Sequence, residues 1–163
     1  ESGSIEGQVL QIFADAYTPV VDSSAIPTGE IASVEGTPMD FRTEKQIGQD
    51  IRADFEQLHF TGGYDHNYVL GRPGEKKIMA NAYCRESGIA LEAETDCCGV
   101  QFYAGNFIGE QTGKGGASYH DRSAFCLESQ FYPNAVNEPD FPSPVVKAGD
   151  TYHTETSYQF YLR

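Results

Sequence analysis

The sequence predicts an all-β protein, built as a sandwich or a barrel. Polar and apolar residues alternate with a period of two in several segments, which is the pattern of strands that bury one face. Glycine (17 residues) and proline (8 residues) separate these segments at short intervals, as in proteins made of many short strands joined by turns. Helical periodicity is weak throughout, which also favours the all-β class.

The N-terminal third of the chain contains one strand pattern and one weak helical pattern. Residues 8–16 (QVLQIFADA) are predicted to form a strand. Residues 44–52 (EKQIGQDIR) give the best helical pattern, and we expect a short helix or turn there because Gly48 weakens a longer one.

The middle of the chain predicts a β-hairpin and two further strands. Residues 77–84 and 89–96 have strand patterns and flank the turn Glu86-Ser87-Gly88. Residues 99–107 (GVQFYAGNF) and 124–132 (AFCLESQFY) are predicted to be strands as well.

The C-terminal residues predict a last strand, and two stretches predict loops. Alternation places one set of side chains on one face of this strand, namely Tyr152, Thr154, Thr156, Tyr158 and Phe160. Residues 109–118 and 133–144 have the composition of loops. Neither an internal repeat nor a linker divides the chain, so we expect a single domain or a large part of one.

The charge balance excludes several partners. The chain has 11 Lys and Arg against 24 Asp and Glu, a net charge of −13. Such a chain repels phosphate backbones and anionic membrane surfaces, so we expect no nucleic acid and no membrane partner. The basic residues are dispersed, which favours a neutral substrate over a phosphorylated one.

The cysteines and histidines predict neither a disulfide framework nor a metal site. The four cysteines (Cys84, Cys97, Cys98 and Cys126) match no zinc or scaffold spacing, and the four histidines are scattered. We expect no signal peptide and a cytoplasmic location. The chain begins at Glu1 rather than Met, so we expect it to be a piece of a longer protein.

Three polar residues are candidates for a functional site. Glu128 lies in the middle of a predicted strand between apolar neighbours, where desolvation would suit a general base; the alternative is an acid on a solvated face. Asp65 follows two glycines that could aim its side chain at a sugar hydroxyl, or it could cap backbone amides in a turn. Gln101 could bind a hydroxyl group or be a surface amide.

A series of motifs resembles the galactose mutarotase (aldose 1-epimerase) family. The motifs occur in the family's order from about residue 4 to residue 160, and they are YTP (17–19), IPTGEI (26–31), GTPMDFR (36–42), GYDHN (63–67), GVQFYAGNF (99–107), FCLESQ (125–130) and FYPNAVN (131–137) with FPS (141–143). The resemblance implies a large antiparallel β-sandwich of which residues 1–163 form the C-terminal portion.

The resemblance also implies roles for the three candidates. Glu128 resembles the family's general base, Asp65 its hydroxyl-binding carboxylate and Gln101 a substrate-binding amide. The implied substrate is a free monosaccharide, and no cofactor is implied. The family's general-acid histidine lies in an Asn-His motif that this chain lacks, so the missing N-terminal half is an expected partner and this chain alone is expected to be inactive.

Three alternative functions remain open from the sequence. A non-catalytic carbohydrate-binding sandwich would bind sugars without exchanging their anomers. A hexose-6-phosphate 1-epimerase would need an arginine-rich phosphate pocket. A structural or assembly β-domain would need neither property.

Overall fold

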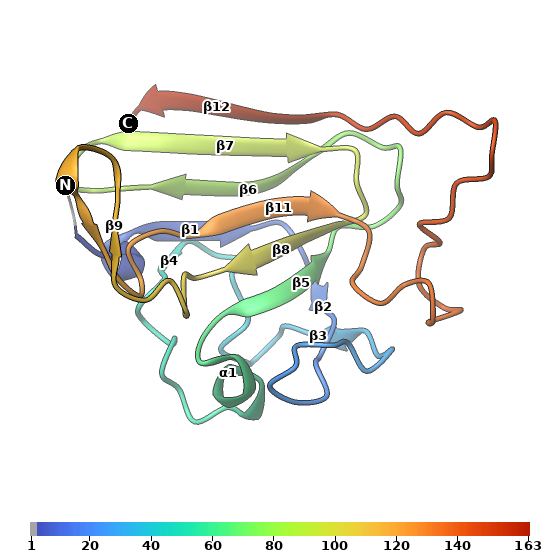
Figure 1. The fold of residues 1–163 in the computed structure, drawn as a ribbon, viewed down its shortest axis with the longest axis horizontal. Coiled ribbons are helices and arrows are strands. Elements are labelled where there is room, and N and C mark those ends of the chain that lie inside the picture. The colour runs from blue at the N-terminus through green and yellow to red at the C-terminus, as the bar shows by residue number, and fades with distance from the viewer. Residues whose placement is uncertain (1–2) are drawn as a thin grey trace.

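The computed structural model describes residues 3–163 and confirms the all-β prediction (Figure 1). The strands, in chain order, are β1 (Val9–Ile12), β2 (Ala16–Tyr17), β3 (Ala32–Ser33), β4 (Lys45–Gln46), β5 (Asp65–Val69), β6 (Lys77–Tyr83), β7 (Ile89–Thr95), β8 (Gly99–Tyr103), β9 (Gln111–Thr112), β10 (Ser118–Tyr119), β11 (Cys126–Gln130) and β12 (Thr156–Leu162). The helical elements are the 3-10 turns η1 (Ile5–Gly7) and η2 (Lys114–Gly116) and the helix α1 (Glu56–Thr61).

The strands form two five-stranded sheets that pack face to face. The first sheet has the order β12-β7-β6-β1-β4 and the second the order β11-β8-β5-β2-β3. All strand pairs of both sheets are antiparallel. The two sheets therefore make the antiparallel sandwich that the sequence predicts. No helix in the described part of the chain is long and apolar enough to cross a bilayer.

The central strand predictions are confirmed, with shorter bounds at several ends. The predicted hairpin is the antiparallel pair β6–β7, with a register shift between Ile78 and Ala80. β8 ends at Tyr103, before Gly105, whose φ of +65° turns the chain. β11 covers the middle of its predicted range. The C-terminal strand begins only at Thr156, since residues 151–155 are not in a strand.

The first predicted strand, 8–16, is wrong as a single element. β1 belongs to the first sheet and β2 to the second, so residues 13–15 carry the chain from one layer to the other. The Phe13 N–H still donates to Met79 O and the Val34 N–H to Asp15 O, so both layers hold this crossing. Alternation continues across such a bend, and the pattern therefore gives no sign of it.

The helical prediction for 44–52 is also wrong. These residues contain the edge strand β4 followed by turns, in which Ile47 and Ile51 are buried at a spacing that imitates a helix face. The α-helix of the described chain is instead α1, which ends at Gly62 with a φ of +65°. Residues 109–118, predicted as a loop, contain β9, η2 and the first residue of β10. β9 and β10 pair with each other as a separate two-stranded sheet. Residues 133–144 have no strand, as predicted.

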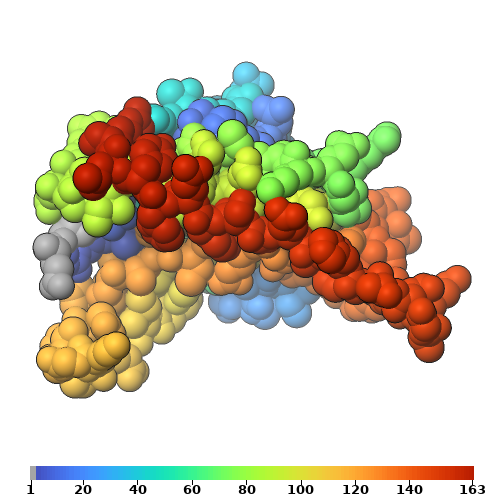
Figure 2. Space-filling view, turned by 90° about the horizontal axis from the view of Figure 1, so that it is seen from above, coloured from blue at the N-terminus to red at the C-terminus, as the bar shows by residue number. Residues whose placement is uncertain are grey.

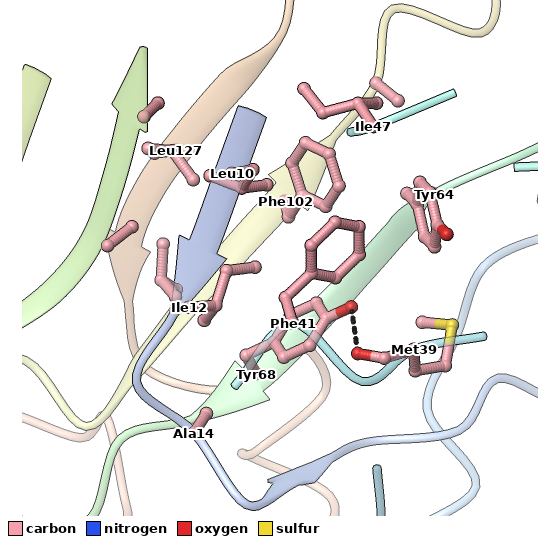
Figure 3. Packing of buried hydrophobic residues seen from close by; sticks show 14 of the residues in the cluster. Leu10, Ile12, Ala14, Met39, Phe41, Ile47, Tyr64, Tyr68, Phe102 and Leu127 are labelled. Atoms are coloured by element: carbon pink, nitrogen blue, oxygen red, sulfur yellow. Dashed lines mark hydrogen bonds between the residues drawn. The ribbon is translucent and has the colours of Figure 1, made fainter. Parts of the chain in front are cut away.

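The core between the sheets is built around aromatic rings (Figure 3). Phe102 of β8 stacks on Tyr64 with ring centroids 5.2 Å apart and meets Phe41 edge-on at 5.5 Å. Tyr68 of β5 is fully buried, and its hydroxyl donates to Met39 O at 3.0 Å. Leu10 and Ile12 of β1 face these rings from the first sheet. The core thus fixes the positions of β5 and β8, which carry the candidate site.

One end of the sandwich leaves apolar surface uncovered. β12 is the outer strand of the first sheet. In Figure 2 the C-terminal residues, coloured red, run across the surface that faces the viewer. Phe160 and Leu162 are 69% and 82% exposed. A hollow of about 530 Å³ lies beside them and is lined by Ala82, Leu91 and Phe125, among others. Apolar surface of this kind is typical of sheets that pack against further structure.

His66 of β5 makes the stability of the fold depend on pH. Its ring is fully buried and meets Tyr17 edge-on at 5.9 Å. Nδ1 accepts the Asp65 N–H at 3.3 Å, so protonation of Nδ1 would break this bond. Burial lowers the pKa of His66 to about 4.

We expect acid to destabilise the chain through His66. The unfolded state binds a proton near pH 6.5 while the folded state does so only near pH 4, so stability is full above pH 6.5 and falls as the pH decreases between these values. The loss is about 1.4 kcal/mol per pH unit. Urea unfolding at several pH values measures it. His66→Phe is expected to remove this part of the slope, whereas His59→Gln, at an exposed site, is expected to keep it; equal slopes in wild type and His66→Phe would contradict the assignment.

Candidate functional site

Three neighbouring strands of the second sheet share a polar outer face. Alternate residues of β5, β8 and β11 point into the core, among them His66, Phe102 and Leu127. The residues between them face outward, and the register sets them in rows across the sheet. One row contains Glu128, Gln101 and Asn67, and the next contains Cys126, Tyr103 and Asp65.

The turn before β5 positions Asp65. Gly62 and Gly63 have φ values of +65° and +138°, in the region that glycine favours. A Cβ at Gly63 would lie 2.6 Å from Arg122 Nη1, so the turn has no room for a side chain. The Asn106 amide donates to Thr61 O at 2.8 Å and to Tyr64 O at 3.0 Å, and Arg122 Nη2 donates to Gly62 O at 2.6 Å. These bonds hold the start of β5 in place.

The structure brings the three predicted site residues onto this one face. Gln101 lies directly opposite Glu128 on β11 and opposite Asn67 on β5. Gln101 Nε2 donates to Asp65 Oδ1 at 2.8 Å. The carboxylate of Asp65 is therefore bonded to a side chain of the sheet rather than to amides of the preceding turn, which was the alternative reading of the sequence.

The expected desolvation of Glu128 is wrong for this chain. Glu128 is exposed, although Leu127 beside it is buried. The apolar neighbours in the sequence point to the opposite face of β11, into the core, and therefore cannot shield the carboxylate. The carboxylate is exposed on the polar face, where a ligand or a further segment of protein can reach it.

Burial and negative charge shape the electrostatics of this face. Burial raises the pKa of Asp65, and the bond from Gln101 partly offsets this effect. The pKa of the Cys126 thiol is also raised, first by burial and then by the carboxylates of Glu128 and Asp65. Both carboxylates thus act on the same thiol. In the part of the chain that the structure describes, no group of His, Cys, Asp and Glu has the geometry of a metal site.

Two polar residues of this face carry no role in the sequence analysis. Gln130 Nε2 donates to Gln101 Oε1 at 3.1 Å and to Asn67 Oδ1 at 3.2 Å. The signal that could have found them is their spacing, because Asn67 and Gln130 each lie two residues after a candidate carboxylate. A period of two puts such residues on the same face of a strand.

The fold and the polar face of the second sheet place this chain among antiparallel β-sandwich proteins that have an open polar sheet face. The family is given by comparison with known proteins. The aldose 1-epimerase family matches residues 1–159, and the chain belongs to this family.

Individual relatives agree with this assignment. The chain is 43% identical to a galactose mutarotase of Sus scrofa over 160 residues, covering 98% of this chain and 45% of the relative. It is 37% identical to an aldose 1-epimerase of Escherichia coli over 163 residues, covering 98% and 46%. A solved aldose epimerase homologue from C. elegans superposes with a TM-score of 0.81 at 28% identity, covering 99% of this chain and 47% of that chain. This chain therefore spans about half the length of the relatives it matches.

Proposed function

We propose that this chain forms the base-carrying part of an aldose 1-epimerase that interconverts the α and β anomers of free hexoses such as galactose and glucose. Membership of the family supports the reaction class. The observation that carries the proposal is the placement of Glu128 opposite Gln101, which is itself bonded to Asp65, on one face of adjacent strands. In this proposal Glu128 is the general base, while Asp65 and Gln101 bind hydroxyl groups.

The proposed reaction opens and recloses the sugar ring. The Glu128 carboxylate takes the proton of the anomeric hydroxyl while an acid protonates the ring oxygen, and the C1–O5 bond breaks to give the aldehyde. Rotation about C1–C2 presents the other carbonyl face, and closure returns both protons and gives the other anomer. The exposure of Glu128 supports this role because the carboxylate is open to a substrate.

The acid in this proposal is a histidine in a segment outside this chain, and residues 1–163 are the C-terminal portion of one sandwich domain. The coverage of about half of each relative supports this division. The exposed Phe160 and Leu162 and the hollow beside β12 support the packing of further strands against this end.

The engagement of four of the six arginines, with Arg72 and Arg85 exposed on separate turns, supports a neutral sugar over a hexose 6-phosphate. Arg42, Arg52 and Arg163 pair with Asp40, Glu6 and Glu44 at 2.6–2.8 Å. Arg122 donates to backbone oxygens around the Gly62 turn. A phosphate site needs guanidinium groups that are free to converge on one anion.

Polarimetry tests the proposed function. The complete protein is expected to speed the decay of optical rotation of freshly dissolved α-glucose or α-galactose, whereas this chain alone is expected to leave the rate at that of buffer. Activity of this chain alone would overturn the division of roles between the two segments. Sugar binding by the complete protein without anomer exchange would instead favour a non-catalytic carbohydrate-binding module.

The proposed location is the cytoplasm. The four cysteines are all free thiols, which supports a reducing compartment.

A further inference from the structure

The amide of Gln130 connects two strands of the polar face. Its Nε2 donates to Gln101 Oε1 on β8 at 3.1 Å and to Asn67 Oδ1 on β5 at 3.2 Å. Gln101 in turn donates from Nε2 to Asp65 Oδ1 at 2.8 Å. The four side chains thus form one chain of hydrogen bonds that runs from Asn67 through Gln130 and Gln101 to the carboxylate of Asp65.

The negative charge of Asp65 fixes which group donates and which accepts in each of these hydrogen bonds. An ionised carboxylate only accepts hydrogen bonds, so Gln101 must turn its Nε2 toward Asp65 and its Oε1 away from it. That oxygen then needs a donor, which Gln130 supplies. Without this donor, the Gln101 oxygen would have no partner in the sheet, and the bond to Asp65 alone would hold the amide.

Close packing holds the other end of the chain. Asn67 is 2% exposed. Gly99 lies beside it, and a Cβ at Gly99 would collide with Asn67 Oδ1 and would lie 2.9 Å from the Tyr132 ring. The absence of a side chain at Gly99 therefore lets Asn67 approach, and the buried Asn67 oxygen anchors the second N–H of Gln130.

We propose that Gln130 is a positioning residue of this site, which holds the Gln101 amide with its N–H groups toward Asp65 and so presents both residues to a sugar in a fixed orientation. The inference rests on the proposed function in one respect, that Asp65 and Gln101 bind substrate hydroxyls. The hydrogen-bond chain itself can be tested without any sugar.

The first test is Gln130→Met in this chain, which keeps the volume and removes the donor. The Gln101 amide is then held by Asp65 alone, so it is expected to become more mobile and to form a weaker bond to Asp65, a bond that lowers the pKa of this carboxyl. Carboxyl NMR titration is expected to show Asp65 titrating at higher pH than in the wild type, with averaging of the Gln101 side-chain amide signals. The matched control is Gln46→Met on the edge strand β4, whose amide reaches only Gly7 O at 3.4 Å. An unchanged Asp65 titration and unchanged Gln101 signals in folded Gln130→Met would overturn the proposal.

A second variant keeps the test decisive if Gln130→Met does not fold. In Gln130→Glu, the introduced carboxyl group can donate to Gln101 only when it is protonated. The Gln101 amide signals are therefore expected to match wild type at acid pH and to change as the new carboxyl ionises. Signals that follow wild type at all pH values would contradict the proposal.

The complete protein separates this inference from the proposed function. In Gln130→Met, KM for galactose is expected to rise about tenfold with a smaller change in kcat, because a substrate-binding amide has lost its orientation. Absence of anomer exchange in the wild-type protein would refute the proposed function and leave the NMR result standing. Normal exchange with an unchanged KM in Gln130→Met would refute the positioning role alone.

Discussion

Glu128→Gln is expected to lower the turnover of the complete protein by about 10²–10⁴-fold, the range that one general base contributes. The substitution keeps the shape of the side chain, but a neutral amide cannot accept the anomeric proton. Glu128 lies opposite Gln101 and is exposed, so the change leaves the core and the Gln130–Gln101–Asp65 bonds intact. Polarimetric rates at saturating galactose measure the effect.

A matched substitution separates the loss of a base from the loss of a charge. Glu75→Gln removes one carboxylate from an exposed turn between β5 and β6, and it is expected to leave turnover unchanged. KM is expected to change little in Glu128→Gln, because the binding residues Asp65 and Gln101 remain. Turnover of Glu128→Gln near the wild-type value would remove Glu128 as the base.

Local patterning predicted the strands of the second half of the chain well, for a physical reason. β6, β7, β8 and β11 bury one face each, so their sequences alternate and their turns contain glycine or polar residues. The register of β11 on β8 and of β8 on β5 then follows from burial, because a shift by one residue would turn Phe102 and Leu127 to the solvent.

The errors occurred where tertiary contacts decide the local conformation. Residues 13–15 bend from one sheet to the other without interrupting the alternation of the sequence. Ile47 and Ile51 are buried from turns at a spacing that also fits a helix. The helix α1 has only six residues, too few for a periodic pattern, and its clearest sequence mark is the glycine that ends it.

The sequence predicts which side chains of the candidate site share a face of one strand, but it does not predict the contacts between side chains of different strands. Period-two counting puts Glu128 and Gln130 on one face of their strand, and Gln101 and Tyr103 on one face of theirs. It does not say that β5, β8 and β11 are neighbours, and this adjacency is what joins Asp65, Gln101 and Gln130 by hydrogen bonds. It also does not predict the exposure of Glu128, since the apolar residues beside it belong to the other face.

Phe102→Ala is expected to destabilise this chain by about 3–5 kcal/mol, as for other large buried aromatic residues. Phe102 is fully buried, and its ring contacts Tyr64 and Phe41 as well as Phe125, whose centroid is 6.2 Å away. Truncation leaves a cavity between the two sheets, and these rings cannot close it because β5 and the Tyr64 hydroxyl bond to Pro38 O hold them in place. Urea denaturation followed by tyrosine fluorescence measures the loss.

The same substitution at Phe160 provides the control. That ring is 69% exposed at the open end of the sandwich, so Phe160→Ala in this chain is expected to change stability by about 0.5 kcal/mol or less. Because Phe102 belongs to β8, its loss is also expected to loosen the strand that carries Gln101 before the chain unfolds globally. Hydrogen exchange of the β8 amides faster than that of β6 would show this order. A loss below about 1 kcal/mol for Phe102→Ala would contradict the central place of this ring in the core.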